Sequence, residues 1–236
     1  MTKKILITGA NGQLGHEMRN ALKGNNRFEC IFTDVAELDI CNAEAVKQII
    51  ADNHIDYIVN CAAYTQVDKA EDNAELCKKI NTDAVENLAR AAADYGARMI
   101  HISTDYVFNG RGYSPYTEDM PPDPQSVYGS TKLEGEKILT DICPESIIIR
   151  TAWLYSPYGN NFVKTMLHLG EEREELSVVA DQIGTPTCAA DLAQAILVIL
   201  QADTFVPGTY HFSDEGVCSW YDFTVTIHRL AGIATC

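Results

Sequence analysis

The sequence is short of positive charge. Its 236 residues contain 18 lysines and arginines against 33 aspartates and glutamates, which gives a formal net charge of −15. A chain without a basic stripe or an Arg-rich arm lacks the phosphate contacts from which nucleic-acid affinity largely comes. The composition therefore argues against nucleic-acid binding, and the acidic excess is typical of a solvated surface.

Long hydrophobic runs are missing as well. The longest uninterrupted apolar run covers residues 195–200, whereas a helix that crosses a bilayer needs about 20 apolar residues. The apolar stretch near the N-terminus is too short for a signal peptide. We expect a cytoplasmic protein that makes no contact with a membrane.

The cysteines do not form the pairs of a zinc site. The sequence has eight of them, at positions 30, 41, 61, 77, 143, 188, 218 and 236, and none is part of a Cys-x-x-Cys motif. The six histidines do not cluster either. We expect reduced, mostly buried cysteines and no structural metal.

What is present is a regular alternation of short β-rich runs with longer amphipathic stretches. Strands are expected at residues 4–7, 28–32, 57–59, 98–102, 147–150 and 176–179, and helices at residues 13–23, 43–52, 73–95, 126–139, 162–172, 189–202 and 220–230. Ser219 is a plausible N-cap for the last helix. This order predicts an α/β fold, a Rossmann-type doubly wound parallel sheet with helices on both faces.

The alternation loosens after about residue 150, where turn-rich segments follow. We expect a nucleotide-binding domain at residues 1–152 and a smaller C-terminal lobe for the substrate at residues 153–236. Parts of this lobe would return to the sheet, so that the boundary is approximate.

The first expected strand leads into a Gly-x-x-Gly-x-x-Gly turn formed by Gly9, Gly12 and Gly15. Glycines at such a turn allow a positive φ and let the backbone approach a pyrophosphate, and the following helix offers free N–H groups to the phosphates. Between a strand and a helix the pattern predicts a dinucleotide site. The remaining candidates in this turn are Asn11, Gln13 and Leu14.

A carboxylate at the end of the second strand would complete such a site. Asp34 lies 19 residues after Gly15, close to the separation of about 20 at which an acidic residue holds the adenosine ribose. With no arginine adjacent, Asp34 slightly favours NAD(H) over NADP(H), although it could also be an ordinary strand-end cap. Asp39 and Ile40 could border the adenine. Ala62, Ala63, Tyr64 and Thr65 follow the third strand, where small residues let a cofactor pass.

Tyr128 and Lys132 form a Tyr-x-x-x-Lys motif on an expected helix. Residues four apart share one face of a helix, and a nearby ammonium would lower the pKa of the phenol from about 10 toward a range useful for proton transfer. The pair also occurs by chance on many helices. Its weight comes from the segment 101–108, because a hydroxyl there, Thr104 or Ser103, could hydrogen-bond a substrate carbonyl.

Several longer segments then carry a resemblance. Residues 103–108, 128–136, 150–155, 160–162 and 181–187, together with 60–71, are similar to the dTDP-4-dehydrorhamnose reductase family among the extended short-chain dehydrogenase/reductases. The similarity covers essentially the whole chain. It implies reduction of the C4 ketone of dTDP-4-dehydro-β-L-rhamnose to dTDP-β-L-rhamnose with NADH or NADPH.

The resemblance also implies roles for single residues. Tyr128 would donate the proton, Lys132 would tune it and hold the nicotinamide ribose, and Thr104 would bond the C4 oxygen. The implied substrate contacts are Thr104, Asp105, Trp153 and Asn161. Mg²⁺ would be a weak possibility, and a homodimer is possible.

Three alternatives remain open. The methionine adenosyltransferase accessory subunit resembles the same family, so the chain could be a regulatory subunit. It could act instead on another nucleotide sugar as a reductase or an epimerase. A 4,6-dehydratase is disfavoured, because those relatives carry Glu where Asp105 is followed here by Tyr106. Family members also continue beyond the position of Cys236 through an Arg-Pro element, so we expect a shortened C-terminus that puts substrate affinity in doubt.

Overall fold

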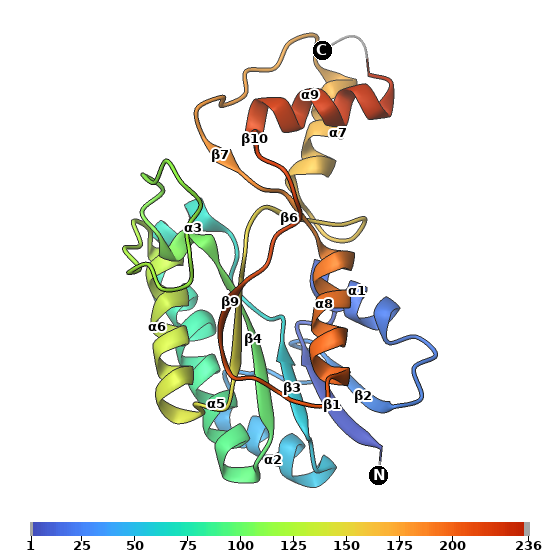
Figure 1. Cartoon of the computed structure of the whole chain (residues 1–236), viewed down its shortest axis with the longest axis vertical. Helices are drawn as coiled ribbons and strands as arrows, with labels where there is room; N and C mark the ends of the chain where they lie inside the picture. Colours follow the sequence, from blue (N-terminus) through green and yellow to red (C-terminus); the bar gives the residue numbers. More distant parts are fainter. Residues whose placement is uncertain (1, 234–236) are drawn as a thin grey trace.

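The structure, a computed structural model, describes residues 2–233 and is built around one parallel sheet (Figure 1). The sheet has six strands in the order β2-β1-β3-β4-β5-β9, and every neighbouring pair is parallel. The strands are β1 (Lys3–Thr8), β2 (Phe28–Thr33), β3 (Tyr57–Asn60), β4 (Arg98–Thr104), β5 (Ile147–Thr151) and β9 (Gly208–His211). The chain moves to one side of β1 with β2 and to the other side with β3. Ligands of such sheets bind outside the carboxyl ends of the strands at that reversal.

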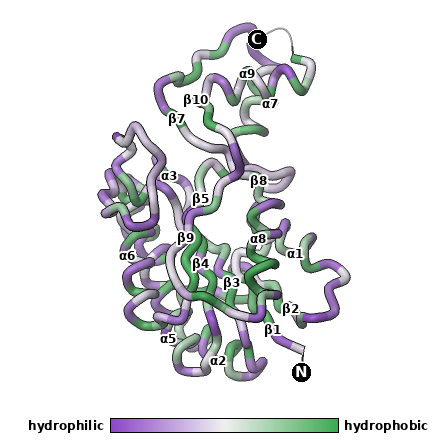
Figure 2. The backbone as a smooth tube through the Cα atoms, in the orientation of Figure 1, coloured by the Kyte–Doolittle hydropathy of each residue, from purple (hydrophilic) through white to green (hydrophobic). Residues whose placement is uncertain are grey.

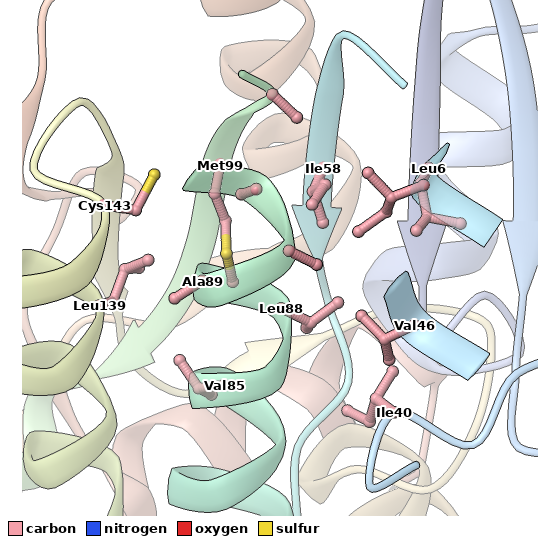
Figure 3. Packing of buried hydrophobic residues seen from close by; sticks show 14 of the residues in the cluster. Leu6, Ile40, Val46, Ile58, Val85, Leu88, Ala89, Met99, Leu139 and Cys143 are labelled. Atoms are coloured by element: carbon pink, nitrogen blue, oxygen red, sulfur yellow. The ribbon is translucent and has the colours of Figure 1, made fainter. Parts of the chain in front are cut away.

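Helices cover both faces of the sheet, as the alternation predicted. One face carries α2 (Ala43–Asn53), α5 (Ala84–Tyr95) and α6 (Val127–Ile142), and the other carries α1 (Gln13–Ala21) and α8 (Ala189–Gln201). Successive side chains of a strand point to opposite faces. Leu6 therefore packs toward α2 and α5, whereas Ile5 and Ile7 pack toward α1 and α8. Figure 3 shows the first of these clusters, and Figure 2 shows hydrophobic stretches in the central strands β3 and β4 and in α8.

A smaller lobe lies beyond the carboxyl edge of the sheet (Figure 1). It contains the helices α7 (Phe162–Glu172) and α9 (Trp220–Ala231) and the antiparallel pair β7 (Ile183–Gly184) with β10 (Cys218–Ser219). The parallel pair β6 (Leu154–Tyr155) with β8 (Thr187–Cys188) leads into it and out of it. The helix α8 packs on the sheet and β9 is one of its strands. The chain therefore enters the lobe, returns to the sheet and enters the lobe again.

The expected strand at residues 176–179 is wrong. These residues have no regular structure and are only partly buried. Their apolar and polar side chains alternate as in a strand, but no neighbouring strand among residues 2–233 pairs with them. The sixth strand is β9 instead, which pairs with β5 from Ile147↔Gly208 to Arg150↔His211. The sequence analysis missed it because the four residues of β9 are short, half-polar and preceded by Pro207.

The helix expected at residues 73–95 is present over residues 74–95, but it is not a single α-helix. The structure has α3 (Val67–Asp72), α4 (Ala74–Lys78), a π-helical turn η1 (Lys79–Asp83) and then α5. Such π-turns are rare and occur often at functional sites. The expected N-cap Ser219 is confirmed, since it forms a capping box with Asp222.

Two expectations from composition meet the structure here. No helix among residues 2–233 is long and apolar enough to cross a membrane. The seven described cysteines are free, but only Cys77 and Cys143 are buried and the other five are partly exposed. The prediction that most would be buried is therefore wrong; Cys30, for example, lies on the edge strand β2, which has one neighbour only. Cys236 lies outside the described residues.

Candidate functional site

The glycine turn connects β1 to α1 at the carboxyl edge of the sheet. Gly9 has a φ of +64°, and a Cβ there would approach the backbone N and Cα of Ala62 to 2.7 Å. A Cβ on Gly15 would collide with the carbonyl oxygen of Gly9 and with Cα of Ala10. The amide of Gly12 donates to the Gly9 carbonyl at 3.0 Å and closes the turn. The amides of residues 10–12 donate within the protein, but no side chain caps the start of α1. The first N–H groups of α1 are therefore the donors of this glycine cradle that fit a pyrophosphate.

A Gly15→Ala substitution is expected to weaken NADH and NADPH binding at least about tenfold, because the new methyl group has no room between α1 and the turn. Fluorescence titration of the reduced cofactor measures this. The matched control is Gly24→Ala, where a Cβ meets nothing within 4 Å. Unchanged cofactor affinity in Gly15→Ala would show that the turn does not hold the pyrophosphate.

Asp34 lies at the end of β2 and faces this turn. Its Oδ2 accepts a hydrogen bond from the amide of Asn11 at 2.9 Å, and its Oδ1 accepts one from the amide of Val35 at 2.9 Å. The carboxylate is therefore held at the rim of the cradle by two backbone donors, and it keeps the lone pairs that a ribose hydroxyl needs. Of the two further candidates, Asp39 is exposed, whereas Ile40 is buried and packs in the core beneath the rim.

The loop that follows β3 lies on the other side of Gly9. Its residues Ala62, Ala63 and Tyr64 are half-buried and Thr65 is exposed. Asn81 of the π-turn η1 holds this loop with both ends of its amide: it accepts from the Tyr64 amide at 2.8 Å and donates to the Tyr64 carbonyl at 3.1 Å. The sequence analysis missed Asn81, whose only signal is its place in the long polar stretch before α5.

Tyr128 and Lys132 lie on the first two turns of α6, and both are buried. Ser126 caps this helix, since its Oγ accepts from the Gly129 amide at 3.1 Å. A Cβ on Gly129 would collide with the carbonyl of Tyr106. Glycine at this place therefore lets the segment after β4 pack directly against the start of α6.

The expected lowering of the Tyr128 pKa is wrong for this structure. Burial raises the pKa of Tyr128 above its usual value, and a hydrogen bond with Thr104 offsets part of that rise. Lys132 does not lower it, because the amine is engaged elsewhere. The phenol is therefore protonated across the neutral range, which is the form that a proton donor needs.

Lys132 points under β4. Its Nζ donates to the carbonyl of Ile102 at 2.6 Å and lies 3.1 Å from Nε2 of His101. Burial lowers the pKa of Lys132 to about 8, while the carboxylate of Glu136 acts in the opposite direction. His101 is fully buried, and burial together with the charge of Lys132 lowers its pKa well below the usual value.

Thr104 ends β4 and is 5% exposed. Its hydroxyl donates to Oδ1 of Asp105 at 3.0 Å and accepts from the Tyr106 amide at 3.2 Å. Burial raises the pKa of Asp105 to about 6, and the Thr104 hydrogen bond opposes that rise. The structure brings Thr104, Asp105 and Tyr128 together. Ser103, the alternative to Thr104, points to the opposite face of the sheet and donates to Oε1 of Glu136.

Trp153 follows β5 and has a φ of +49°, which is unusual for a residue other than glycine. Its indole stacks on Trp220 of the lobe with ring centroids 3.4 Å apart and an interplanar angle of 11°. A Cβ on Gly184 would approach the indole to 2.5 Å, so glycine is required beneath it. One face of the expected substrate contact is therefore occupied by Trp220, and Trp153 joins the lobe to the sheet.

Asn161 is the N-cap of α7. Its Oδ1 accepts from the amide of Lys164 at 3.1 Å, and its Nδ2 donates to Oε1 of Gln13 at 2.9 Å and to the carbonyl of Ser156 at 2.8 Å. Both ends of the amide have partners within the protein, and the geometry lends no support to its expected substrate contact. Gln13 likewise uses its side chain to tie α1 to the lobe, and only its backbone faces the cradle.

A buried ion pair beneath the site was not predicted. Arg150 on β5 donates from Nη2 to Oε2 of Glu136 at 2.7 Å and from Nε to Oε1 at 3.0 Å. The two side chains are 7% and 5% exposed. The only sequence signal is that Arg150 directly follows the apolar run 147–149, since Glu136 lies in a polar stretch. Elsewhere in residues 2–233 no group of three or more His, Cys, Asp or Glu side chains is placed to hold a metal ion.

Comparisons with known proteins agree with one another. The family described as RmlD substrate binding domain matches residues 3–235. The dTDP-4-dehydrorhamnose reductase of Aggregatibacter actinomycetemcomitans is 44% identical over 228 residues, which are 95% of this chain and 78% of the relative. The spore coat polysaccharide biosynthesis protein SpsK of Bacillus subtilis is 42% identical, over 98% of this chain and 81% of the relative.

Solved structures give the same result. A dTDP-4-dehydrorhamnose reductase of Clostridium acetobutylicum has a TM-score of 0.94 at 52% identity and covers 98% of this chain and 81% of its own. The dTDP-4-dehydrorhamnose reductase of Bacillus anthracis, solved in complex with NADP, has a TM-score of 0.96 at 43% identity and covers 100% of this chain and 83% of its own.

Proposed function

This chain belongs to the RmlD substrate-binding-domain family, and we propose that it reduces the C4 ketone of dTDP-4-dehydro-β-L-rhamnose to dTDP-β-L-rhamnose with NADH or NADPH. The chain is an NAD(P)H-dependent oxidoreductase with a Rossmann-type fold. The observation that supports the assignment of its residues is the close set of Tyr128, Thr104 and Asp105 at the same sheet edge as the glycine cradle.

Tyr128 is the proton donor in this proposal. A reduced nicotinamide held by the glycine turn would supply the hydride that C4 of the substrate takes up. The electron pair of the broken C=O π bond moves to the oxygen, which takes the phenolic proton of Tyr128 and becomes the product hydroxyl. The Thr104 hydroxyl, which donates to Asp105 in this structure, would turn to donate to the same oxygen, and the ammonium form of Lys132 stabilises the phenolate that remains.

The cofactor is held by the turn and by its neighbours. Backbone groups of residues 9–15 bind the pyrophosphate, Asp34 binds the adenosine ribose and residues 62–65 border the nicotinamide half. Lys132 holds the nicotinamide ribose. Asp39 and Ile40 are the weaker candidates, because Ile40 packs into the core.

The substrate is bound between the sheet edge and the lobe in this proposal. Asp105 and Trp153 are the contacts best supported, since Asp105 directly follows β4 and Trp153 follows β5 and stacks on Trp220 of the lobe. The division at residue 152 into a nucleotide-binding part and a substrate lobe is part of the same proposal, with α8 and β9 returned to the first part. A cytoplasmic location and a homodimer stay predictions, and no observation supports the Mg²⁺ expectation.

The direct test is the loss of reduced-nicotinamide absorbance on addition of dTDP-4-dehydro-L-rhamnose, with NADH and NADPH compared. We expect substrate-dependent oxidation, and NMR of the product should show the L-rhamno configuration at C4. A product with another configuration would identify an enzyme of a different nucleotide sugar. Cofactor binding without oxidation, together with capture of a partner protein, would instead indicate a regulatory subunit.

A further inference from the structure

A chain of buried hydrogen bonds crosses three strands and ends at Lys132. Thr8 on β1 donates from Oγ1 to Oδ1 of Asn60 on β3 at 2.7 Å. Nδ2 of Asn60 lies 3.0 Å from Nδ1 of His101 on β4, and Nε2 of His101 lies 3.1 Å from Nζ of Lys132. Asn60 and His101 are both 0% exposed and Lys132 is 1% exposed. Solvent therefore offers these groups no alternative partner.

The backbone amide of Ala62 fixes the orientation of the Asn60 side-chain amide, because it can only donate a hydrogen bond. The backbone amide of Ala62 donates to Oδ1 of Asn60 at 3.2 Å, and a backbone N–H cannot accept. Oδ1 therefore faces Thr8 and Ala62. The NH₂ group must then face His101, so that Nδ1 of the imidazole is the acceptor.

This orientation decides the tautomer of the histidine. A neutral imidazole carries one N–H, and if Nδ1 accepts from Asn60 the proton is on Nε2. An Nε2–H group facing Lys132 can donate to a neutral amine, but it opposes an ammonium. Asn60 and the ammonium form of Lys132 therefore compete for the single lone pair of His101.

We propose that His101 is a positioning residue for Lys132: Asn60 holds it in the Nε2–H tautomer, and this N–H donates to Nζ and favours the neutral amine in the cofactor-free protein. Nζ keeps the carbonyl of Ile102 as its own acceptor. The ammonium that the proposed reaction needs therefore forms against this preference, with its proton taken from solvent. The assignment deepens the proposed function, on which the role of Lys132 rests, but the tautomer itself does not depend on that function.

The charged and titratable groups around Lys132 do not reverse this preference. Cys77 approaches from α4 and Glu136 lies one turn further along α6, and both favour the ammonium. The carboxylate of Glu136 is neutralised by Arg150 of β5. His101 is the group that faces Nζ from β4. With burial, the net effect is a pKa of about 8 for Lys132, so that the neutral amine is a minor form at pH 7 and the main form only above pH 8.

The first experiment is ¹⁵N NMR of the cofactor-free protein at neutral pH, with labelled histidine, to determine which ring nitrogen of His101 carries the proton. We expect Nε2–H with Nδ1 as an acceptor. The Nδ1–H tautomer, or an imidazolium with both nitrogens protonated, would overturn the proposal. The signal is assigned by its loss in His101→Gln or, if that variant does not fold, by elimination with substitutions at the other five histidines. The result is independent of turnover.

The second experiment compares the pH profile of kcat/KM in the wild type and in His101→Gln. The glutamine amide can turn its oxygen to Lys132 and so accept from the ammonium. The alkaline limb, which falls as Lys132 loses its proton, should then move to higher pH by about one unit. A merely structural role would lower activity at every pH and leave the limb in place, which would contradict the proposal. The matched control is His228→Gln. His228 is a buried histidine of the lobe, and its Nε2 lies 2.9 Å from the Met166 carbonyl oxygen. In this variant the alkaline limb of the kcat/KM profile should stay at the pH of the wild type.

Discussion

Tyr128→Phe is expected to lower kcat by about 100- to 10,000-fold, the range over which a positioned proton donor contributes. The substitution removes the phenolic oxygen alone. The ring keeps its packing against Ala70 and Cys77 and its edge contact with Tyr106, whose ring centroid is 5.5 Å away. The dissociation constants for NADH and NADPH should therefore change less than about twofold. Stopped-flow turnover and fluorescence titration measure the two quantities.

The matched control for this prediction is Tyr106→Phe. Tyr106 lies beside Tyr128, but it is 41% exposed and no proton transfer is assigned to it. It should retain turnover within about threefold, because phenylalanine keeps the ring and with it the edge contact to Tyr128. Equal turnover in the wild type and Tyr128→Phe would remove Tyr128 from the reaction.

Arg150→Leu is expected to destabilise the fold by about 3–5 kcal/mol, the cost of leaving a buried charge without its partner. Glu136 is 4% exposed and would keep only the Ser103 hydroxyl as a side-chain donor. Urea unfolding followed by circular dichroism measures the change in the free energy of unfolding. The double variant Glu136→Leu with Arg150→Leu should recover much of the loss, because both charges are then absent.

Arg90→Leu is the surface control for the ion pair. Arg90 lies 2.6 Å from Glu86 on α5, but its side chain is 64% exposed, and exposed pairs contribute about 0–1 kcal/mol. A similar small loss in Arg150→Leu would show that burial does not make the Glu136 pair important. A double variant less stable than Arg150→Leu would show that the loss comes from packing rather than from an unpaired carboxylate.

The sequence determined the local features of this protein. The alternation of short apolar runs with longer amphipathic stretches was sufficient to predict five of the six strands of the sheet. A strand of a parallel sheet has helices on both faces, so its side chains are apolar on both sides. The glycine turn, the helix with Tyr128 and Lys132 and the capped helix after Ser219 follow from residues within one turn of each other, since φ angles, caps and helical spacing are local properties. Local rules predicted a hydroxyl at the carboxyl edge after the fourth strand, but the choice of Thr104 over Ser103 came from the family resemblance.

The tertiary structure decided which distant residues meet. β9 becomes a strand because β5 offers it a free edge, whereas residues 176–179 find none. Trp153 is stacked by Trp220, which lies 67 positions later in the chain. The hydrogen-bond partners of Lys132 come from β4, and the chain of hydrogen bonds behind them runs through β3 to β1. Sequence spacing carries no information about such contacts. Burial then decides the chemistry, because the same tyrosine and lysine on an exposed helix would have neither the protonated phenol nor the lowered amine pKa that this site has.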